Sequence, residues 1–442
     1  MSFKKDIGFR KEALTKLLHN IIRHENDIVE ALSKDFKKPP FESIITETSY
    51  VISDLKNTIS NLASWAKPKK VASSLLNFPS SDAIYSEPYG NVLIISPWNY
   101  PFQLALSPVI AAVAAGNSVV LKPSELTPAT STVISKIIRE TFDAKHVVAI
   151  LGDASMAGEL LKQRWDYIFF TGSIKVGKII AKVAAENLTP VALELGGKSP
   201  CIVDETANVP LAAKRIVWGK FINAGQTCIA PDYIVVHNSI KSYFVSCIKE
   251  EITKAYGEDP AISPDFARII NNDNWKRLNN MIESHKIIFG GITNEDERYI
   301  APTIIEENNT DSELMKHEIF GPLLPILTYV NYEDIHKIIS KYEKPLSLYI
   351  FTENRDFSEK IIKEYSFGGG CINDTLIHFS NKRLPFGGVG QSGNGAYHGK
   401  YGFDAFSHKK AIVTKANWLD IPLRYAPYKN KLKTMKRLLK WF

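Results

Sequence analysis

Two hydrophobic rhythms follow one another along the chain. In residues 9–36 and again in residues 44–66, apolar side chains recur three and four positions apart, the spacing of one helix face. The pattern therefore predicts an amphipathic helix over each stretch, the second ending before Pro68. Residues 71–89 are rich in Ser and Pro and hold few long apolar runs, which predicts an extended connection.

From residue 92 the rhythm changes to short apolar runs separated by helical segments. "VLIIS" (92–96), "SVVLKPS" (118–124) and "YIFFTGS" (167–173) have the length and composition of buried strands. Short strands that alternate with helices build a parallel, doubly wound sheet. Ligands of such sheets bind beyond the carboxyl ends of the strands, so "SPWNYP", "KPSE" and "TGS" are the expected lining of a site.

A second alternating region begins near residue 199. It runs from "SPCIVDE" through "DYIVVH", "LPILTYV" and "LSLYIFT", again with helical segments between the apolar runs. This region is long enough to form an α/β unit of its own. The sequence thus predicts an α/β protein with two sheets.

Composition narrows the class of protein. A chain of 442 residues is too long for one ordinary core, and 45% hydrophobic with 23% charged residues is typical of a soluble globular protein. The longest apolar run falls short of the roughly 18 residues that cross a bilayer. The start of the chain has no apolar signal-peptide core, which argues against secretion.

Cysteine use and charge exclude further classes. Four scattered cysteines without a CxxC pair indicate a reducing compartment, the cytoplasm, and argue against disulfides or a zinc site. The formal net charge is +7, but six Lys or Arg and no acidic residue lie in residues 429–442. The rest of the chain is close to neutral, so a local basic tail is indicated and a general nucleic-acid surface is not.

Two glycine patterns resemble nucleotide motifs only in part. Gly388 to Gly393 fits GxGxxG but follows no buried strand, so an irregular loop is the better interpretation. Gly172 to Lys178 nearly fits a Walker A loop, yet Ile179 stands where a magnesium-binding hydroxyl belongs. What remains is a strand–glycine–helix junction that suits the phosphates of a dinucleotide without magnesium.

Three side chains are candidates for chemistry. Cys228, in "GQTCIAPDY", is a nucleophile or an inert packed thiol. Asn99 is an oxyanion donor or a turn residue, and Glu194 is a general base or half of an ion pair. Taken alone, these residues leave the alternatives open.

Seven motifs in order resemble the aldehyde dehydrogenase superfamily, most closely its class 3 branch of aromatic and fatty aldehyde dehydrogenases. The motifs are "PWNYPF" (97–102), "KPSE" (122–125), "FFTGS" (169–173), "LELGGKSP" (193–200), "GQTCIAPDY" (225–233), "EIFGPLLPI" (318–326) and "PFGGVGQSG" (385–393). Each motif alone is modest evidence, whereas seven in the family's order are highly specific.

The resemblance implies roles for the three candidates. Cys228 is expected to add to the aldehyde carbonyl, giving a thiohemiacetal and then a thioester. Asn99, with the backbone N–H of Cys228, would stabilise the oxyanion, and Glu194 would activate water against the thioester. The other cysteines, Cys201, Cys247 and Cys371, are expected to be structural.

The resemblance also implies the cofactor and its contacts. The expected cofactor-binding residues are Trp98, Lys122, Glu125, Thr171, Gly172, Ser173, Gly177, Glu318 and Phe320. Lys122 and Glu125 would hold the adenosine ribose, and Glu318 the nicotinamide ribose. The Glu125 carboxylate repels the extra phosphate of NADP, which favours NAD and leaves NADP, which class 3 members tolerate, as the alternative. No metal is expected.

An aromatic tunnel is the expected substrate site. Its implied residues are Tyr50, Tyr100, Trp218, Phe379, Phe386 and His398. Such a lining favours aromatic or medium- to long-chain aliphatic aldehydes. Core packing is the alternative for each residue, and His398 has a second alternative as a satisfied loop histidine.

The resemblance divides the chain into expected units. Residues 1–68 and 89–194 would bind NAD(P) on a Rossmann-type sheet, and residues 195–395 would form the catalytic domain. Residues 69–88 and 403–416 would bridge protomers of a homodimer, with residues 417–442 as a basic tail. The helix in that tail is expected to dock on the dimer in preference to a membrane surface.

Three other functions are weighed against aldehyde oxidation, and each predicts a different feature of the sequence. A coenzyme A-acylating relative would replace water by a thiol acceptor, against which the presence of Glu194 argues. A non-catalytic nucleotide-binding protein of the same fold would not need every catalytic position to be filled. A nucleotide-hydrolysing enzyme is disfavoured by Ile179.

Overall fold

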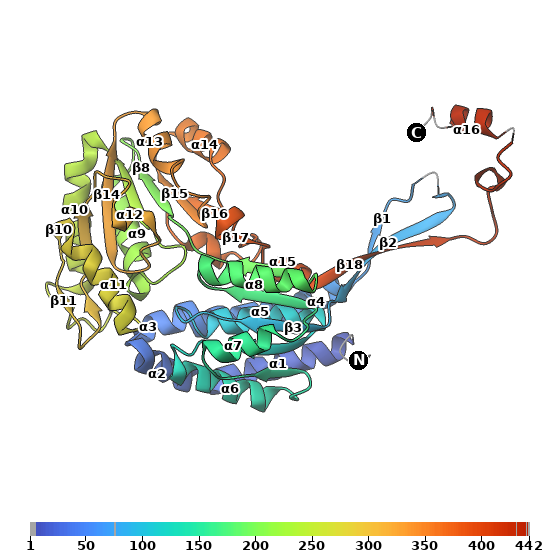
Figure 1. Cartoon of the computed structure of the whole chain (residues 1–442), viewed down its shortest axis with the longest axis horizontal. Helices are drawn as coiled ribbons and strands as arrows, with labels where there is room; N and C mark the ends of the chain where they lie inside the picture. Colours follow the sequence, from blue (N-terminus) through green and yellow to red (C-terminus); the bar gives the residue numbers. More distant parts are fainter. Residues whose placement is uncertain (1–5, 75–76, 430, 439, 441–442) are drawn as a thin grey trace.

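The computed structural model describes residues 6–74, 77–429, 431–438 and 440. Two lobes pack against one another, and a narrow ribbon of strands projects from one of them (Figure 1). One hydrophobic core includes side chains from the sheets of both lobes, among them Val92 and Val203. The lobes are therefore packed together, and a site between them has fixed walls.

The N-terminal helices differ in detail from the prediction. The single helix predicted over residues 9–36 is two helices, α1 (Ile7–Arg23) and α2 (Glu25–Phe36). They break at His24, whose backbone leaves helical geometry while its ring lies 2.8 Å from Asp27 and 2.9 Å from Glu140. These two polar contacts hold the bend.

The second predicted helix begins with an irregular turn. After the short α3 (Pro40–Ser43), residues 44–48 form a π-helix, η2 (Ile44–Thr48), and only then does α4 (Ser49–Ala66) begin. The predicted end before Pro68 is confirmed. One π-turn hardly changes the spacing of apolar residues along a helix, so the hydrophobic pattern does not distinguish it from an α-helix.

The first lobe contains the predicted doubly wound sheet. Its strands are β3 (Asn91–Ile95), β4 (Ser118–Lys122), β5 (Val147–Ala149), β6 (Tyr167–Thr171), β7 (Val191–Glu194) and β17 (Gly393–Asn394). They lie in the order β17-β7-β6-β3-β4-β5, all parallel except β17. The chain reverses its direction of travel at β3, where doubly wound sheets bind ligands.

Helices alternate with these strands. They are α5 (Gln103–Ala115), α6 (Pro128–Thr141), α7 (Ala154–Leu161) and α8 (Ile174–Glu186). Gly172 lies between β6 and α8, as the strand–glycine–helix interpretation predicts. The GxGxxG-like stretch forms a 3-10 turn followed by β17, not the start of a helix beyond a buried strand.

The second lobe is built on another, mostly parallel sheet. Its strand order is β10-β13-β14-β9-β8-β15-β16. The strands are β8 (Pro200–Val203), β9 (Tyr233–His237), β10 (Lys286–Phe289), β13 (Thr303–Glu306), β14 (Leu323–Tyr329), β15 (Ser347–Phe351) and β16 (Gly369–Ile372). Between β10 and β13 in the sequence, β11 (Thr293–Asn294) and β12 (Tyr299–Ile300) form a separate antiparallel pair.

The helices of this lobe surround the sheet (Figure 1). They are α9 (Val209–Phe221), α10 (Lys241–Tyr256), α11 (Asn272–Glu283), α12 (Glu313–Lys316), α13 (Tyr332–Ile339) and α14 (Arg355–Glu364). Helix α9 ends in the short turn η4 (Ile222–Gly225), which leads into the segment that carries Cys228.

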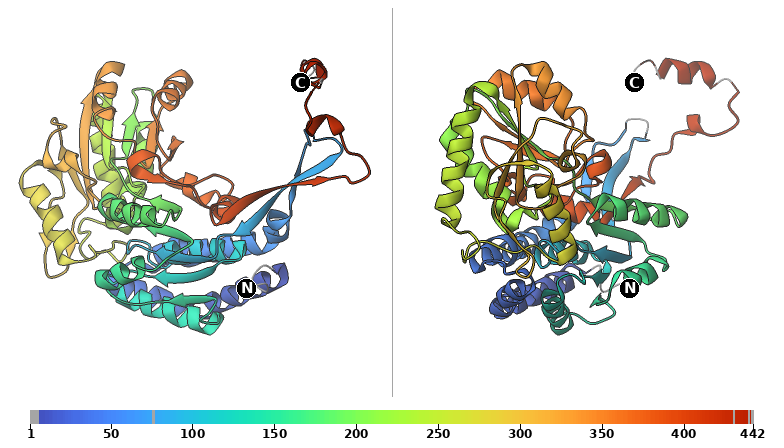
Figure 2. Two further views of the ribbon diagram at one scale, coloured as in Figure 1. Left: turned by 45° about the vertical axis from the view of Figure 1, so that its right-hand side comes forward. Right: turned by 60° about the vertical axis from the view of Figure 1, so that its left-hand side comes forward.

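The projecting ribbon consists of antiparallel strands from both ends of the chain. β1 (Lys69–Val71) and β18 (Ser407–Lys415) pair on either side of β2 (Ser80–Pro88). Residues 403–405 belong to the preceding helix α15 (Gly399–Ala405). The left view of Figure 2 shows the ribbon standing away from the lobes.

The described part of the chain continues beyond the ribbon (Figure 1). Helix α16 (Leu432–Leu438) lies within the predicted basic tail, of which residues 430, 439 and 441–442 are outside the described part of the chain. None of the helices within the described residues has the length and apolar character needed to cross a bilayer.

Candidate active site

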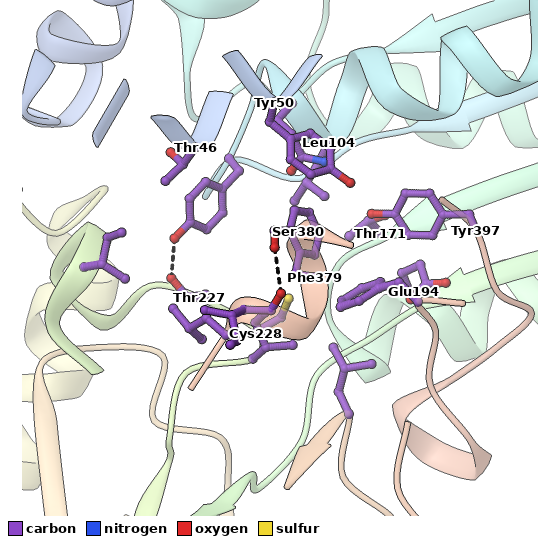
Figure 3. Close-up of a pocket in the computed structure, with 18 of the residues that line it drawn as sticks. Thr46, Tyr50, Leu104, Thr171, Glu194, Thr227, Cys228, Phe379, Ser380 and Tyr397 are labelled. Atoms are coloured by element: carbon purple, nitrogen blue, oxygen red, sulfur yellow. Dashed lines mark hydrogen bonds between the residues drawn. The ribbon is translucent and has the colours of Figure 1, made fainter. Parts of the chain in front are cut away.

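An apolar cavity of about 230 Å³ lies where the two lobes meet. Both Cys228 and Glu194 line it (Figure 3). Of the predicted tunnel residues, the cavity wall includes Tyr50, Tyr100, Trp218, Phe379 and Phe386. The structure therefore brings a thiol, a carboxyl group and an aromatic wall from distant parts of the sequence into one space.

Cys228 is held by a turn of unusual backbone geometry. Asn223, Ala224 and Gly225 have φ values of 56°, 52° and 73°, in the left-handed region. A Cβ at Gly225 would overlap the carbonyl oxygen of Gly321, so glycine is required there. Non-glycine residues adopt such angles only where the surroundings enforce them, and such strain is concentrated at functional sites.

Gln226 fixes the same turn from inside. Its side-chain amide donates to the carbonyls of Asn223 and Arg268, each at 3.0 Å. Its oxygen accepts from the backbone N–H of Ile270 at 2.9 Å. This fully buried amide leaves the following residues, including Cys228, little freedom.

The electrostatic surroundings hold the Cys228 thiol in its protonated form. Burial raises its pKa well above the usual range, and the nearby carboxyl groups of Glu318 and Glu194 raise it further. The reactive form of cysteine is the thiolate, so this site needs a proton acceptor or a nearby positive charge. The other thiols, Cys201, Cys247 and Cys371, lie outside the cavity wall, and the first two are buried.

Glu194 ends strand β7 with an unpaired carboxyl group. Its backbone is secured, because its carbonyl accepts from Gly172 at 3.0 Å and its strand pairs with Gly393. Within the described part of the chain neither carboxylate oxygen has a hydrogen-bond partner. Burial raises the pKa of Glu194 well above its ordinary value. A buried, unpartnered carboxyl group in a cavity is characteristic of a functional site.

Asn99 lies close to the cysteine turn. It is buried just beyond the end of β3, and its carbonyl accepts from the side-chain amide of Asn223 at 2.9 Å. Its neighbour Tyr100 hydrogen-bonds Thr227, with 2.7 Å between their hydroxyl oxygens. Two bonds thus join the Asn99 segment to the turn at Asn223 and to Thr227 just after it, although the cavity wall itself does not include Asn99.

The strand ends of the first sheet offer polar groups suited to a dinucleotide. Lys122, at the end of β4, forms an ion pair with Glu125. Among the described residues, the hydroxyls of Ser96 and Thr171 are buried without partners just beyond β3 and at the end of β6. Ser173 caps α8, whose free N–H groups and dipole favour a phosphate.

Glycines keep this region open. A Cβ at Gly172 would approach the ring of Phe170 to 2.5 Å, and one at Gly177 would approach Leu195 to 2.7 Å. Unpartnered hydroxyls, a helix N-terminus and close glycine packing together fit a dinucleotide along these strand ends.

Glu318 and Phe320 come from the second lobe to the same region. A Cβ at Gly196 would overlap the Glu318 carboxylate, which shows how closely that carboxylate meets the segment after Glu194. Burial and Asp232 raise the pKa of Glu318 to about 8, against opposing effects from a backbone N–H and nearby cations. Phe320 has a left-handed φ of 51° and packs edge-on against Trp98 at 5.2 Å.

His398 lies behind the aromatic wall and not on it. Its ring lies 5.0 Å from Phe386, 4.6 Å from Phe379 and 4.5 Å from Tyr397, between ring centroids. These rings lie between His398 and the cavity, so His398 does not line the cavity as predicted. Neither ring nitrogen has a partner among the described residues, so His398 is not a satisfied loop histidine either. Burial lowers its pKa to about 3.

Several residues at the site were absent from the sequence prediction. Thr46, Gln103 and Tyr397 line the cavity, and Asn223 and Thr227 make the bonds that join the two loops. Tyr397 and Thr227 adjoin predicted residues in sequence, which was an available signal. The described residues contain no cluster of three or more His, Cys, Asp or Glu side chains able to hold a metal.

Comparison with known proteins gives a consistent result. Over residues 4–412 the chain matches the aldehyde dehydrogenase family. It is 49% identical over 438 residues to the Staphylococcus aureus protein named 4,4'-diaponeurosporen-aldehyde dehydrogenase, covering 99% of this chain and 95% of that one. Aldehyde dehydrogenase family 3 member H1 of Arabidopsis thaliana is 44% identical over 437 residues, with 98% and 90% covered.

A solved structure agrees with these relatives. The substrate-bound state of Staphylococcus aureus AldH superposes with a TM-score of 0.97 at 48% identity, covering 99% of this chain and 96% of that one. Fold and cavity together define the class of protein, an α/β oxidoreductase with a Rossmann-type sheet. The chain belongs to the aldehyde dehydrogenase family and oxidises aldehydes, with NAD or NADP as the family's cofactor. The predicted resemblance to its class 3 branch is confirmed.

Proposed function

We propose that this protein oxidises an aromatic or medium- to long-chain aliphatic aldehyde to the carboxylic acid, with NAD as the preferred cofactor. One observation carries the proposal. The Cys228 thiol and the unpartnered carboxyl group of Glu194 line the same apolar cavity. A nucleophile and a base that share one cavity are what aldehyde oxidation through a thioester requires.

The first half-reaction forms a carbon–sulfur bond. The Cys228 sulfur adds to the aldehyde carbon, and the carbonyl electron pair moves to oxygen. The thiol proton passes to the carboxylate of Glu194, which lines the same cavity. Asn99 and the backbone N–H of Cys228 stabilise the oxyanion, and one such donor contributes about 3 kcal/mol. NAD(P), when bound, supplies the hydride acceptor that turns the thiohemiacetal into a thioester.

The second half-reaction returns the free enzyme. Glu194 first releases the thiol proton to solvent and then takes a proton from water, whose oxygen adds to the thioester carbon. The carbon–sulfur bond then breaks, the carboxylic acid leaves, and the Cys228 sulfur takes up the proton held by Glu194. Its raised pKa makes Glu194 a stronger base than an exposed glutamate. A coenzyme A-acylating enzyme would have no use for a base that activates water. We therefore expect hydrolysis, with turnover independent of added coenzyme A.

The cofactor is proposed to lie along the strand ends of the first sheet. Lys122 and Glu125 would hold the adenosine ribose, with Thr171, Gly172, Ser173 and Gly177 at the phosphates, and Trp98, Glu318 and Phe320 at the nicotinamide end. The oxidised nicotinamide is positively charged, which would favour the Cys228 thiolate and offset the unfavourable surroundings of the free enzyme.

The aromatic wall supports an apolar substrate. Tyr50, Tyr100, Phe379 and Phe386 offer large apolar surfaces, while Trp218 is 42% exposed. These surfaces bind flat or long apolar groups by excluding water. One relative is named for 4,4'-diaponeurosporen-aldehyde, so that aldehyde belongs in the test panel.

We also propose a cytoplasmic homodimer. The ribbon of β1, β2 and β18 carries exposed apolar residues, among them Tyr85, Ile412 and Val413, which a second copy would cover. The basic tail is proposed to dock on that dimer. Four unpaired cysteines support the reducing cytoplasm. Light scattering of the purified protein tests the dimer, and a monomer would contradict it.

A panel of aldehydes with both cofactors tests the proposed activity. Chains of increasing length and aromaticity are mixed with NAD or NADP, and reduced cofactor is followed by absorbance. Cys228→Ala should abolish turnover while cofactor still binds by calorimetry. Cys371→Ala, which removes a half-buried thiol outside the cavity wall, is the matched control and should keep activity. Full activity in Cys228→Ala would end the proposal.

A further inference from the structure

A group of buried charged residues lies next to the site without taking part in the proposed reaction. Lys38 and Glu47 are both fully buried, and Glu42 is nearly so. All three lie on α3, the π-helix η2, or the residues just before them. A buried ion pair adds little net stability even when its geometry is good, and π-turns often occur at functional sites. Their position therefore calls for a functional reason.

Glu47 holds the start of helix α5. One of its oxygens accepts from the Lys38 ammonium at 2.7 Å. The other accepts from the backbone N–H groups of Phe102 and Gln103, at 3.1 Å and 2.8 Å. A carboxylate at a helix N-terminus is stabilised by the unpaired N–H groups and the helix dipole. Since Asn99 is three residues before Phe102, Glu47 anchors the loop that carries it.

Lys38 extends this anchor toward the nucleophile. Its ammonium lies 4.0 Å from the centroid of the Tyr100 ring, a cation–π contact in a buried setting. The Tyr100 hydroxyl in turn bonds Thr227, the residue before Cys228. A chain of contacts therefore runs from Glu47 through Lys38 and Tyr100 to the cysteine segment.

Glu42 supports the second junction between the two loops. Its carboxylate accepts from the backbone N–H of Asn223 at 2.9 Å. The Asn223 side chain donates to the carbonyls of Asn99 and of Gln226, at 2.9 Å and 3.1 Å. The same short segment of the chain thus contacts both loops, each through a buried carboxylate.

We propose that Glu47, paired with Lys38, is a positioning residue that fixes Asn99 relative to Cys228. The inference rests on the proposed function, because it assigns these two residues to one oxyanion site. An oxyanion donor must lie within hydrogen-bond distance of a developing charge, and a displacement of about 1 Å can cost about a hundredfold in rate. The hydrogen bonds from Asn223 and Thr227 join this loop to the cysteine segment, and the buried ion pair fixes the end of the loop where α5 begins.

Glu47→Gln tests the proposal with minimal change of shape. One of the two side-chain atoms then becomes an N–H donor, which cannot replace both contacts of the carboxylate. We expect acylation of Cys228 by 4-nitrophenyl acetate, a reaction that needs no cofactor, to slow by about 10- to 100-fold. Alkylation of Cys228 by iodoacetamide, followed by peptide mass spectrometry, involves no oxyanion and should keep its wild-type rate.

Asp35→Asn is the matched control. Asp35 is another buried carboxylate at a helix N-terminus, accepting from the N–H groups of Ala129 and Thr130 at the start of α6. Its replacement should cost comparable stability by thermal melting and leave acylation unchanged. Equal loss of acylation in both variants would show a general effect of helix capping and overturn the proposal.

Further outcomes are equally decisive. Unchanged acylation in Glu47→Gln, or a parallel loss of alkylation, would refute positioning by Glu47. If Glu47→Gln does not fold, Lys38→Met/Glu47→Gln leaves no unpaired buried charge and must show the same separation of the two rates. Should wild-type acylation persist in Cys228→Ala, the proposed function fails first, and this experiment identifies that case separately.

Discussion

The two sides of Cys228 differ in how their side chains are held. On the cavity side, Tyr50, Phe379 and Phe386 pack as rings, and His398 behind them keeps both nitrogens unpartnered within the described structure. On the other side, some polar groups are paired, such as Lys122 with Glu125, while the hydroxyls of Ser96 and Thr171 have no partner among the described residues. The apolar side can recognise shape and exclude water, while the polar side offers hydrogen-bonding groups to a ligand.

Each side changes the chemistry of the other. Burial is the largest cause of the raised pKa of both Cys228 and Glu194. A dry wall therefore strengthens Glu194 as a base, and it also makes the thiol harder to ionise. The site needs the polar side to compensate, and the following variants test that division.

The largest effect is expected from Glu194→Gln. The amide cannot accept a proton from water, so hydrolysis of the thioester should slow by about a thousandfold. Glu194 also accepts the thiol proton in the first half-reaction, so acylation should slow as well. Where hydrolysis slows more than acylation, one equivalent of reduced cofactor forms in a burst and the acyl-enzyme accumulates, visible by intact-protein mass spectrometry. Glu353→Gln, at an exposed position, is the control. Wild-type turnover in Glu194→Gln would remove the carboxyl group from the mechanism.

The next largest effect is expected from Asn99→Ala, which should lower kcat by about a hundredfold. The variant removes an oxyanion donor, whereas the Asn99 carbonyl that accepts from Asn223 belongs to the backbone and remains. Iodoacetamide should therefore still alkylate Cys228 at the normal rate. An equal fall in alkylation would mean that the variant disturbs the cysteine turn and not the oxyanion.

The dependence of activity on pH tests the effect of burial on the pKa values of Glu194 and Cys228. Both Glu194 and Cys228 have pKa values raised mainly by burial, and both must lose a proton before the reaction proceeds. As pH rises through neutrality, kcat/KM should therefore increase, by up to about tenfold per pH unit while one group limits. A flat profile from pH 6 to 9 would contradict the proposed proton transfers.

Much of this site could be predicted from sequence because motifs and strand ends coincide. "LELGG" ends a strand and "GQTC" follows a helix, so Glu194 and Cys228 meet through ordinary α/β geometry. The Lys38–Glu47 pair had no such signal. The backbone N–H groups that Glu47 binds at the start of α5 lie more than fifty residues away, and the spacing of the π-turn that carries Glu47 cannot be told from that of an α-helix.

His398 shows the opposite limit. The family resemblance predicts His398 among the tunnel residues, but the packing of the aromatic rings decides which of them faces the cavity. Three aromatic neighbours occupy that surface. Sequence similarity therefore predicts which residues lie near one another. Which side chain faces the cavity depends on how His398 and its three aromatic neighbours pack together.

Phe379→Ala tests whether the aromatic wall of the cavity binds the substrate. Removing this ring takes away surface that an apolar chain would cover, at about 25 cal/mol per Å², so KM for a long or aromatic aldehyde should rise about tenfold. Turnover of propanal, which is too short to need the wall, should change little. Phe357→Ala, on the distant helix α14, is a matched control. Equal effects on long and short aldehydes would argue against an aromatic substrate wall.

The smallest effect is expected from Glu125→Gln, on the polar side. If Glu125 contacts the adenosine ribose, its charge repels the extra phosphate of NADP, and the amide should shift the ratio of kcat/KM values toward NADP. Because the Glu125 side chain is 39% exposed, solvent and salt screen that charge. Lys122 also neutralises it in part. A contribution of up to about 1 kcal/mol corresponds to roughly fivefold. Raising the salt concentration should shrink the difference between Glu125→Gln and wild type, whereas a shift that persists in high salt would point to a contact of shape and not of charge.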